Sequence, residues 1–199
     1  RGGFASVYLG RWLETAVAVK VMPEAADGVH MVEARLLQKL RHPCVCALLG
    51  VCMFDERPSM VLEYMTGGSL HDLLHNATDG VDIDTPLLTR MVVEVASGVA
   101  YLHANGVMHR DVKTANVLLD DARHAKVTDF GISTRFGRKD YTAETGTYRQ
   151  MAPEVILHKP YNYKCDVYSY GVLLWEALHR QVPFTGFAPL QAAFAVAME

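Results

Sequence analysis

Residues 108–131 read MHRDVKTANVLLDDARHAKVTDFG, and this stretch decides the fold. Asp111, Lys113 and Asn116 fall within six residues, and Asp129 follows the second of two apolar runs. Charged residues this close together usually face water, but here they alternate with short runs of Val, Leu and Ala that are typical of buried strands. Polar side chains held at the ends of buried strands indicate a functional site rather than an ordinary surface.

These four side chains carry the chemical groups that phosphoryl transfer requires. The Asp111 carboxylate is a base for a hydroxyl proton, and the Lys113 ammonium is a cation for a transferring phosphate. The side-chain oxygens of Asn116 and Asp129 are hard ligands of the kind that Mg²⁺ prefers. Because phosphoryl transfer needs alignment and charge neutralisation more than covalent chemistry, the set predicts a phosphotransferase site.

A second charged pair is predicted nearer the start of the chain. The segment AVAVK ends an apolar strand at Lys20, and Glu33 lies on the apolar face of a helix expected over residues 31–41. A half-buried charge needs a partner, because desolvating it alone is costly. We therefore expect Lys20 and Glu33 to pair, although each residue alone is equally typical of a solvated surface.

The first residues, RGGFASV (1–7), are small and precede a strand. Gly2 and Gly3 have no Cβ, so the backbone N–H groups there can approach a phosphate closely. Glycine-rich turns are common, and Ala5 stands where a phosphate-covering G-x-G-x-x-G loop has its last glycine. This segment alone is a weak indication of a nucleotide site.

The composition is that of a globular chain with no special class of partner. The chain has 199 residues, of which 50% are hydrophobic, and a formal net charge of −3, so neither nucleic acid nor an anionic membrane is an expected partner. No apolar run is long enough to span a bilayer, and no secretory signal opens the sequence, so we expect no membrane insertion. The four cysteines have no C-x-x-C spacing, which favours reduced thiols and a cytoplasmic location.

The order of the predicted elements is strand-rich first and helix-rich afterwards. Strands are expected at 4–22 (two strands that turn near Gly10–Arg11), 59–65, 107–108, 117–119 and 125–128. Helices are expected at 31–41, from a Thr85 cap to a stop at Asn105–Gly106, and at 164–179, where apolar residues on nearly every face predict burial on all sides. Two lobes with a cleft between them follow from this order.

Four motifs in this order resemble the signature set of eukaryotic protein kinases. They are AVAVK (16–20), HRDVKTAN (109–116), DFG (129–131) and APE (152–154). The resemblance covers essentially the whole chain and implies an α+β, bilobal protein-kinase fold. It implies a small β-rich N-lobe over 1–65, with a five-strand sheet region and a regulatory helix, and a larger helical C-lobe over 66–199. It also implies a domain truncated at both ends, with its C-terminal helices missing after Glu199.

The family's roles transfer position by position. Lys20 is expected to hold the phosphates of ATP and to pair with Glu33. Asp111 is expected to act as catalytic base beside Lys113 on the γ-phosphate, and Asn116 and Asp129 are expected to hold Mg²⁺. With Leu62 as gatekeeper and residues 63–65 as hinge, the implied nucleotide-binding set is Gly2, Gly3, Val7, Ala18, Lys20, Leu62, Glu63, Met65 and Leu118.

Asp166 is expected to support the catalytic loop from below. The resemblance implies that its side chain accepts hydrogen bonds from the backbone around His109–Arg110. An ordinary acid at a helix N-terminus, favoured by the helix dipole, is the competing interpretation.

Control by phosphorylation is implied for the loop over 132–150. Arg110, next to the catalytic base, resembles an arginine that grips a phosphate placed on this loop. Thr142 and Thr145 are the best candidate sites for an upstream kinase, ahead of Tyr141 and Ser133.

The acceptor is predicted to be a serine or threonine hydroxyl of a protein substrate. Thr114 after Lys113, and Thr147 in GTYRQMAPE, resemble the serine/threonine pattern. Together with HPCVCALLGVC, these segments are most similar to the tyrosine-kinase-like group, including Raf-like kinases of the MAP kinase kinase kinase type. We therefore expect an ATP-dependent protein serine/threonine kinase of signal transduction.

Two other functions fit parts of the pattern. A non-catalytic kinase-fold scaffold is one, but such modules typically lose one or more of the charged residues that are intact here. A small-molecule phosphotransferase is the other, and it generally lacks the activation loop and the APE segment.

Overall fold

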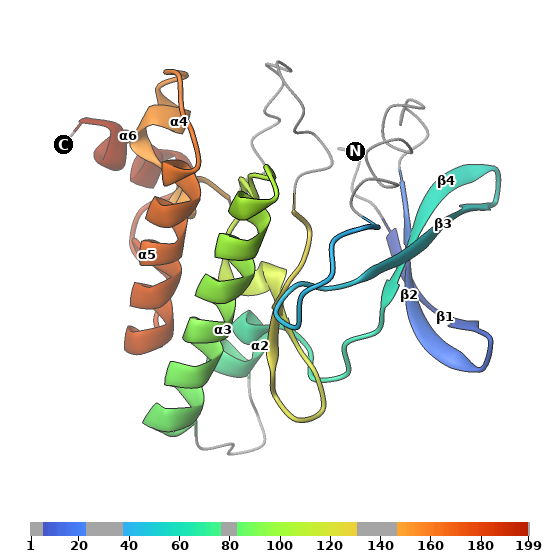
Figure 1. Cartoon of the computed structure of the whole chain (residues 1–199). Helices are drawn as coiled ribbons and strands as arrows, with labels where there is room; N and C mark the ends of the chain where they lie inside the picture. The colour runs from blue at the N-terminus through green and yellow to red at the C-terminus, as the bar shows by residue number, and fades with distance from the viewer. Residues whose placement is uncertain (1–5, 23–37, 77–82, 131–146, 199) are drawn as a thin grey trace.

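The computed structural model describes residues 6–22, 38–76, 83–130 and 147–198. Figure 1 shows an antiparallel sheet on one side and a group of helices on the other, joined by the chain between β4 and α2. The predicted α+β, bilobal arrangement is therefore confirmed. No helix of the described residues is both long enough and apolar enough to cross a membrane.

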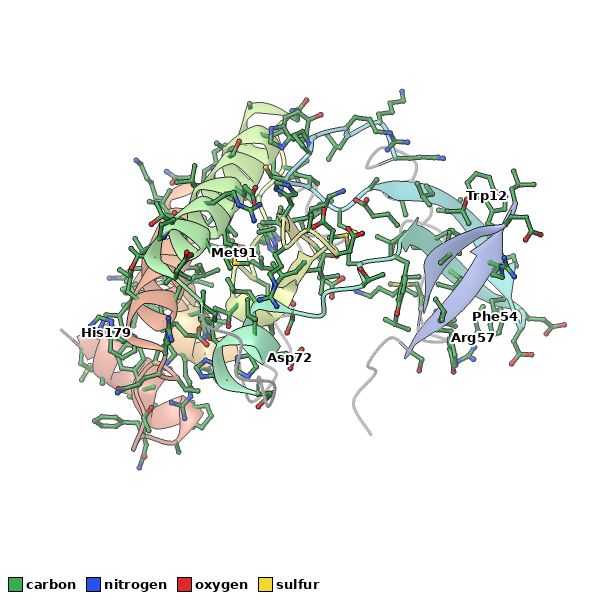
Figure 2. The ribbon with its side chains drawn as sticks, turned by 90° about the horizontal axis from the view of Figure 1, so that it is seen from below. Trp12, Phe54, Arg57, Asp72, Met91 and His179 are labelled. Carbon is green, nitrogen blue, oxygen red and sulfur yellow. The ribbon has the colours of Figure 1, made fainter. Side chains whose placement is uncertain are left out.

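The sheet is built from β1 (Ser6–Trp12), β2 (Thr15–Val21), β3 (Leu48–Phe54) and β4 (Arg57–Glu63). Its strand order is β1-β2-β4-β3, and every neighbouring pair is antiparallel. Within the described residues this sheet has four strands, where a five-strand region was expected. Figure 2 places Trp12, Phe54 and Arg57 at the end of the sheet that is remote from the helices.

The first hairpin turns three residues later than predicted. Leu13 and Glu14 form the turn with φ angles of 45° and 65°, whereas Gly10 remains inside β1. Two consecutive residues with positive φ match the twist of a two-residue hairpin turn. The prediction relied on Gly10, but this residue lies in the strand, where a Cβ would come within 3.1 Å of Val19.

The helical part begins with α2 (Leu70–His75) and the long α3 (Thr85–Ala104). A second hairpin, β5 (Val117–Leu119) and β6 (Ala125–Val127), follows the short helix η1 (Thr114–Asn116). After the gap come η2 (Thr147–Gln150), α4 (Pro153–Ile156), α5 (Lys164–His179) and α6 (Pro189–Met198). Residues 31–37 of the helix predicted over 31–41 lie outside the described residues, and residues 38–41 are not helical.

Helix α3 supplies most of the core of this part. Every residue of its predicted apolar stripe is buried: Leu88, Met91, Val92, Val95, Val99 and Leu102. The predicted Thr85 cap is wrong by one position, because Asp84 caps the helix through a 2.8 Å hydrogen bond from the Leu87 backbone N–H. The predicted strand at 107–108 is absent from the described structure, and the Val107 N–H instead donates to the Leu102 carbonyl.

Helix α5 has the predicted bounds but not the predicted burial. Leu173 and Glu176 are buried, whereas Val167, Trp175 and Leu178 are exposed. The prediction that every side is covered is therefore wrong within the described residues. The distribution of hydrophobic residues along α5 does not show which faces of the helix pack against other elements.

A short segment before β3 ties the two parts together. The Cys46 N–H donates to the Val127 carbonyl at 2.9 Å, and the Val127 N–H donates to the Cys44 carbonyl at 2.9 Å. A Cβ on Gly98 of α3 would collide with the Cys44 carbonyl oxygen. The glycine thus allows this segment to pack directly on α3 and β6.

Candidate active site

The predicted catalytic loop is a compact group of polar contacts. Asn116 Nδ2 donates to both the backbone oxygen and Oδ2 of Asp111, at 2.8 and 2.7 Å. Lys113 Nζ lies 2.7 Å from Asp111 Oδ2. Asp111 Oδ1 is buried and has no hydrogen-bond partner among the described residues. Asn116 and Lys113 therefore hold the carboxylate of the predicted base in one orientation.

Local backbone structure sets this arrangement. The Asn116 N–H donates to the Lys113 carbonyl within η1, which turns the chain back on itself after Asp111. The Thr128 N–H donates to the Asn116 carbonyl at 2.9 Å. Because Thr128 directly precedes Asp129, this bond places the two predicted metal ligands, Asn116 and Asp129, on adjacent segments.

Lys20 crosses from the sheet to this loop. Its Nζ lies 2.8 Å from Asp129 Oδ1, and the lysine side chain is largely buried. Asp129 has a φ of 57°, an unfavourable value for a non-glycine residue and one that often marks functional sites. The predicted partner of Lys20, Glu33, lies outside the described residues, so that pairing stays a prediction.

Asp166 anchors the loop from α5, as predicted. Its two carboxylate oxygens accept the backbone N–H groups of His109 at 2.8 Å and Arg110 at 2.7 Å. Arg110 has a φ of 67°, so these bonds hold a strained turn immediately before Asp111. Burial alone would raise the pKa of Asp166, but the hydrogen bonds from His103, His109 and Arg110 outweigh it and hold that pKa below its ordinary value.

His109 is a buried part of the same support. Its ring packs edge-on against Phe130, with centroids 6.2 Å apart, and its Nδ1 accepts the Asp111 N–H at 3.3 Å. Burial lowers the pKa of His109, against the opposing charges of Asp166 and Asp111, which favours the neutral ring. Neither His103 nor the ring contact of His109 was foreseen from the sequence, because both depend on packing between distant segments.

The structure brings together several of the residues predicted to bind the nucleotide. Ala18 pairs with Leu62 across β2 and β4, and Val7 pairs with Lys20 across β1 and β2. Leu118 forms an isolated bridge with Ser69, just after the predicted hinge. Val7 is exposed and Met65 is buried, whereas Gly2 and Gly3 lie outside the described residues.

The side chain of Glu63, a residue of the predicted hinge, makes structural contacts with neighbouring segments. Its Oε1 accepts the Ala47 N–H at 2.6 Å, and its Oε2 lies 2.7 Å from Lys126 Nζ. The carboxylate thus joins β4 to β6, and the backbone N–H of Glu63 donates to the Ala47 carbonyl at 3.0 Å. The predicted contact of Glu63 with adenine stays a prediction. Lys126 was missed, although a lysine between buried Ala125 and Val127 was the same kind of signal that singled out Lys20.

The residues present fit a divalent cation. Both hydrogen bonds recorded for the Asn116 amide use Nδ2, which leaves Oδ1 as a ligand atom. Lys20 engages Asp129 Oδ1, which leaves Oδ2 on a half-exposed carboxylate. Two neutral or anionic oxygens on adjacent segments are the protein share of a typical Mg²⁺–phosphate site.

The expected phosphorylation sites are outside this description. Thr142, Thr145, Tyr141 and Ser133 lie among the undescribed residues, and so does the side chain of Thr147. The Arg110 guanidinium lies 5.6 Å from the ring centroid of Tyr161, a cation–π contact. The predicted phosphate contact of Arg110 remains a prediction.

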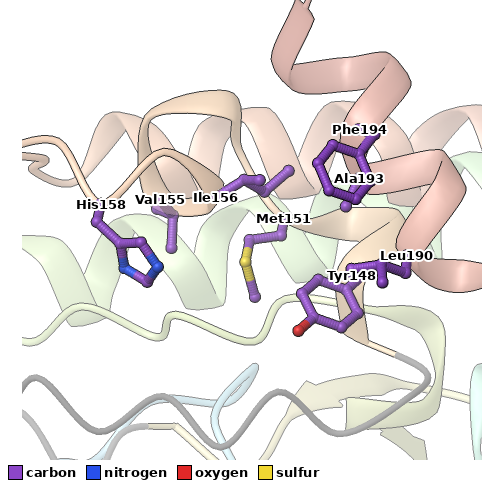
Figure 3. A pocket seen from close by; sticks show the side chains of 8 residues that line it. All are labelled: Tyr148, Met151, Val155, Ile156, His158, Leu190, Ala193 and Phe194. Carbon is purple, nitrogen blue, oxygen red and sulfur yellow. The ribbon is translucent and has the colours of Figure 1, made fainter.

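A separate hollow of about 270 Å³ lies between η2, α4 and α6. Figure 3 shows Tyr148 and Met151 facing Leu190 and Phe194 across it. Its walls are mainly apolar, and none of the residues that we predicted for catalysis or nucleotide binding lines it. The hollow is therefore not the chemical site.

The sequence matches the protein kinase domain family over residues 1–197. This chain belongs to that family. The kinase resemblance is confirmed, and so is the expected tyrosine-kinase-like group. Family membership implies ATP, a divalent metal and a protein substrate as general requirements.

Relatives from two distant organisms are similar across nearly the whole chain. The kinase domain is 41% identical over 201 residues to the serine/threonine-protein kinase STY46 of Arabidopsis thaliana, covering 98% of this chain and 35% of that protein. It is 37% identical over 206 residues to the Arabidopsis serine/threonine/tyrosine-protein kinase HT1, covering 98% of this chain and 53% of that protein. It is 38% identical over 206 residues to the probable serine/threonine-protein kinase drkB of Dictyostelium discoideum, covering 100% of this chain and 30% of that protein. The chain therefore spans only part of each relative.

Proposed function

We propose that this kinase domain transfers the γ-phosphate of ATP to serine or threonine hydroxyls of protein substrates. The observation that carries the proposal is the Asp111 carboxylate, with Oδ2 bound by Asn116 and Lys113 and Oδ1 buried without a partner among the described residues. A base in this state is positioned before substrate arrives, which lowers the cost of reaching the transition state. The names of the relatives support serine/threonine specificity.

Asp111, Lys113 and Lys20 have different roles in this mechanism. The Asp111 carboxylate accepts the proton of the substrate hydroxyl as the hydroxyl oxygen attacks the γ-phosphorus, and ADP leaves with the electrons of the broken P–O bond. Lys113 holds Asp111 in place through its ion pair with Oδ2. When ATP is bound, the Lys113 ammonium also neutralises negative charge on the phosphoryl group that is transferred. Lys20 holds the phosphates from the sheet side. Bound ATP supplies the phosphoryl group, and the cation spreads the charge that develops on it.

We assign the cation as Mg²⁺, held by Asn116 and Asp129. An amide oxygen and a carboxylate oxygen suit this hard ion, whose remaining ligands are usually water and phosphate oxygens. A softer metal would favour nitrogen or sulfur ligands, and the described residues around Asp129 offer oxygens and the Lys20 ammonium.

We also propose that the domain works in cytoplasmic signalling and is switched by an upstream kinase at Thr142 or Thr145. The four cysteines are free thiols, as expected in a reducing compartment. Burial raises the pKa of Cys46 and of Cys165 to about 12, so these thiols stay protonated and unreactive.

The proposal is tested by incubating the chain with γ-labelled Mg·ATP and a generic basic protein, followed by phosphoamino-acid analysis. The expected result is label on serine or threonine that depends on the divalent cation. An Asp129→Asn variant should lose this label, and an Asp55→Asn variant, changed on the exposed β3–β4 turn, should keep it. Label on tyrosine, or a folded chain that binds Mg·ATP without transferring phosphate, would contradict the proposal.

A further inference from the structure

A cluster of two histidines and a glutamate lies beside the catalytic loop, apart from the predicted Mg²⁺ ligands. His71 and His75 are one helical turn apart on α2, and Glu176 comes from α5. Residues at i and i+4 of a helix share one face, so both imidazoles point the same way. Their rings are 4.6 Å apart between centroids. Three groups that commonly bind metals therefore converge from two elements.

The distances match those of metal ligands. Glu176 Oε1 lies 3.0 Å from His75 Nε2 and 3.4 Å from His71 Nδ1, and the three ligand atoms lie within 4.8 Å of one another. Ligand atoms at about 2.0–2.2 Å from a tetrahedral zinc ion are separated from one another by roughly 3.3–3.6 Å. The His71–Glu176 distance already fits this range, and the remaining separations, none above 4.8 Å, would adjust when an ion binds.

The state of Glu176 independently indicates a cation. The residue is only 1% exposed, and its Oε2 is buried with no hydrogen-bond partner among the described residues. All of its recorded contacts, from His71, His75 and Thr114, converge on Oε1. A buried carboxylate is normally paired with a positive charge or coordinates a metal. Within the part of the chain that the structure describes, these contacts include neither lysine nor arginine.

Thr114 connects this cluster to the catalytic loop. Its hydroxyl donates to Glu176 Oε1 at 2.9 Å, and it directly follows Lys113 in the chain. Carboxylates that bind metals are usually held by such a second hydrogen bond. An ion bound at the cluster would therefore be connected, through Glu176 and Thr114, to the loop that carries Asp111.

We propose that His71, His75 and Glu176 form a binding site for one divalent transition-metal ion of the Zn²⁺ type. The ligands are His71 Nδ1, His75 Nε2 and a Glu176 oxygen, and water completes the tetrahedron. The His71 side chain is 37% exposed, which gives the ion a route from solvent. Two imidazoles and one carboxylate exclude Mg²⁺ as the preferred ion, because Mg²⁺ favours oxygen ligands. The site is distinct from Asn116 and Asp129 and does not depend on the proposed activity.

The test is a calorimetric titration of the metal-free chain with Zn²⁺, repeated with Co²⁺ while the visible spectrum is recorded. The expected result is one equivalent of tightly bound metal and a tetrahedral Co²⁺ spectrum without thiolate charge-transfer bands, which separates the site from the cysteines. His71→Gln should weaken Zn²⁺ binding by at least about 100-fold, more than the loss of an outer hydrogen bond usually costs. His179→Gln, a change on the exposed end of α5, should leave it unchanged.

Two further results decide the outcome. Glu176→Gln, which keeps the volume and one acceptor oxygen but removes the negative charge, should lose affinity as well. Because His71 is partly exposed, its variant keeps the fold, and matching circular-dichroism melts establish this. Equal Zn²⁺ affinity in the native chain and in folded His71→Gln would overturn the proposal. A cysteine-type Co²⁺ spectrum would overturn it too, leaving the cluster as a hydrogen-bonded link between α2, the catalytic loop and α5.

Discussion

Asp166 and His103 support the predicted catalytic loop through hydrogen bonds made behind it. The proximity of Asp111 and Asn116 could be predicted because both residues lie in one loop, five positions apart. The contact of Asp166 with the catalytic loop could be predicted only through the family resemblance, because Asp166 accepts a hydrogen bond from the backbone N–H of Arg110, 56 residues earlier in the chain. His103, whose Nε2 lies 2.7 Å from Asp166 Oδ2, gave no signal at all. Its role arises from how α3 and α5 pack.

Asp166→Asn should lower both stability and turnover. The amide cannot accept the same charge-assisted hydrogen bonds, and its NH₂ group faces N–H donors that already fill the site. We expect the free energy of unfolding to fall by roughly 2–4 kcal/mol in urea titrations. Asp55→Asn, on the exposed turn, is the control. Unchanged stability of the Asp166 variant would show that the anchor contributes nothing.

Acid should destabilise the domain through His109. Burial lowers its pKa from the ordinary value of 6.5, so the unfolded state binds the proton more readily than the folded state. Its contribution to stability is therefore complete above pH 6.5 and is lost as the pH falls towards the lower pKa of the folded state. Urea titrations between about pH 7.5 and 5.5 should show falling stability, and His109→Gln should flatten that slope. An equally steep slope in the variant would assign the effect to other histidines.

Helices and strands were predictable in kind, but several of their ends were not. The α3 stripe and the bounds of α5 follow from periodicity over many residues. The errors at Thr85, at Gly10–Arg11 and at 107–108 fall at element ends, where one hydrogen bond decides the outcome. Asp84 rather than Thr85 caps α3 because its carboxylate reaches the Leu87 N–H.

Two helical glycines should respond to alanine in opposite directions. A Cβ on Gly98 of α3 would collide with the Cys44 carbonyl, whereas a Cβ on Gly171 of α5 meets nothing within 4 Å. Gly98→Ala should destabilise the domain by about 1–3 kcal/mol through overpacking. Gly171→Ala should stabilise it by about 0.5–1 kcal/mol through helix propensity. Thermal melts of both variants test this, and equal shifts in one direction would contradict the packing of Cys44 on α3.

In the whole molecule, the sheet and the helical part meet through a few specific contacts. Among the described residues they include the Lys20–Asp129 ion pair, the hydrogen bonds of Cys44 and Cys46 to Val127, and the Glu63–Lys126 ion pair. The sequence singled out Lys20, Asp129 and Glu63 one by one, but it predicted none of these pairings. The Glu63–Lys126 pair spans 63 residues, and no local pattern predicts such a contact.

Mg·ADP should stabilise the domain because we expect it to bind only the folded state, between Lys20 of the sheet and Asp129 of the helical part. At a ligand concentration about 100 times the dissociation constant, the gain is roughly 2.7 kcal/mol, seen as a higher Tm. Asp129→Asn removes a predicted metal ligand and the charge opposite Lys20, so its Tm shift should be much smaller. Mg²⁺ chelation should reduce the native shift similarly. An undiminished shift in the variant would remove Asp129 from the nucleotide site.

The most direct test of the central claim compares native chain and Asp111→Asn at saturating Mg·ATP. The variant retains an oxygen for Asn116 but cannot accept the substrate proton, so the rate of phosphate transfer should fall at least about 100-fold. Mg·ATP affinity should stay within about threefold, because the loss concerns the transition state alone. A variant that transfers phosphate at the native rate would show that Asp111 is not the base and would contradict the account.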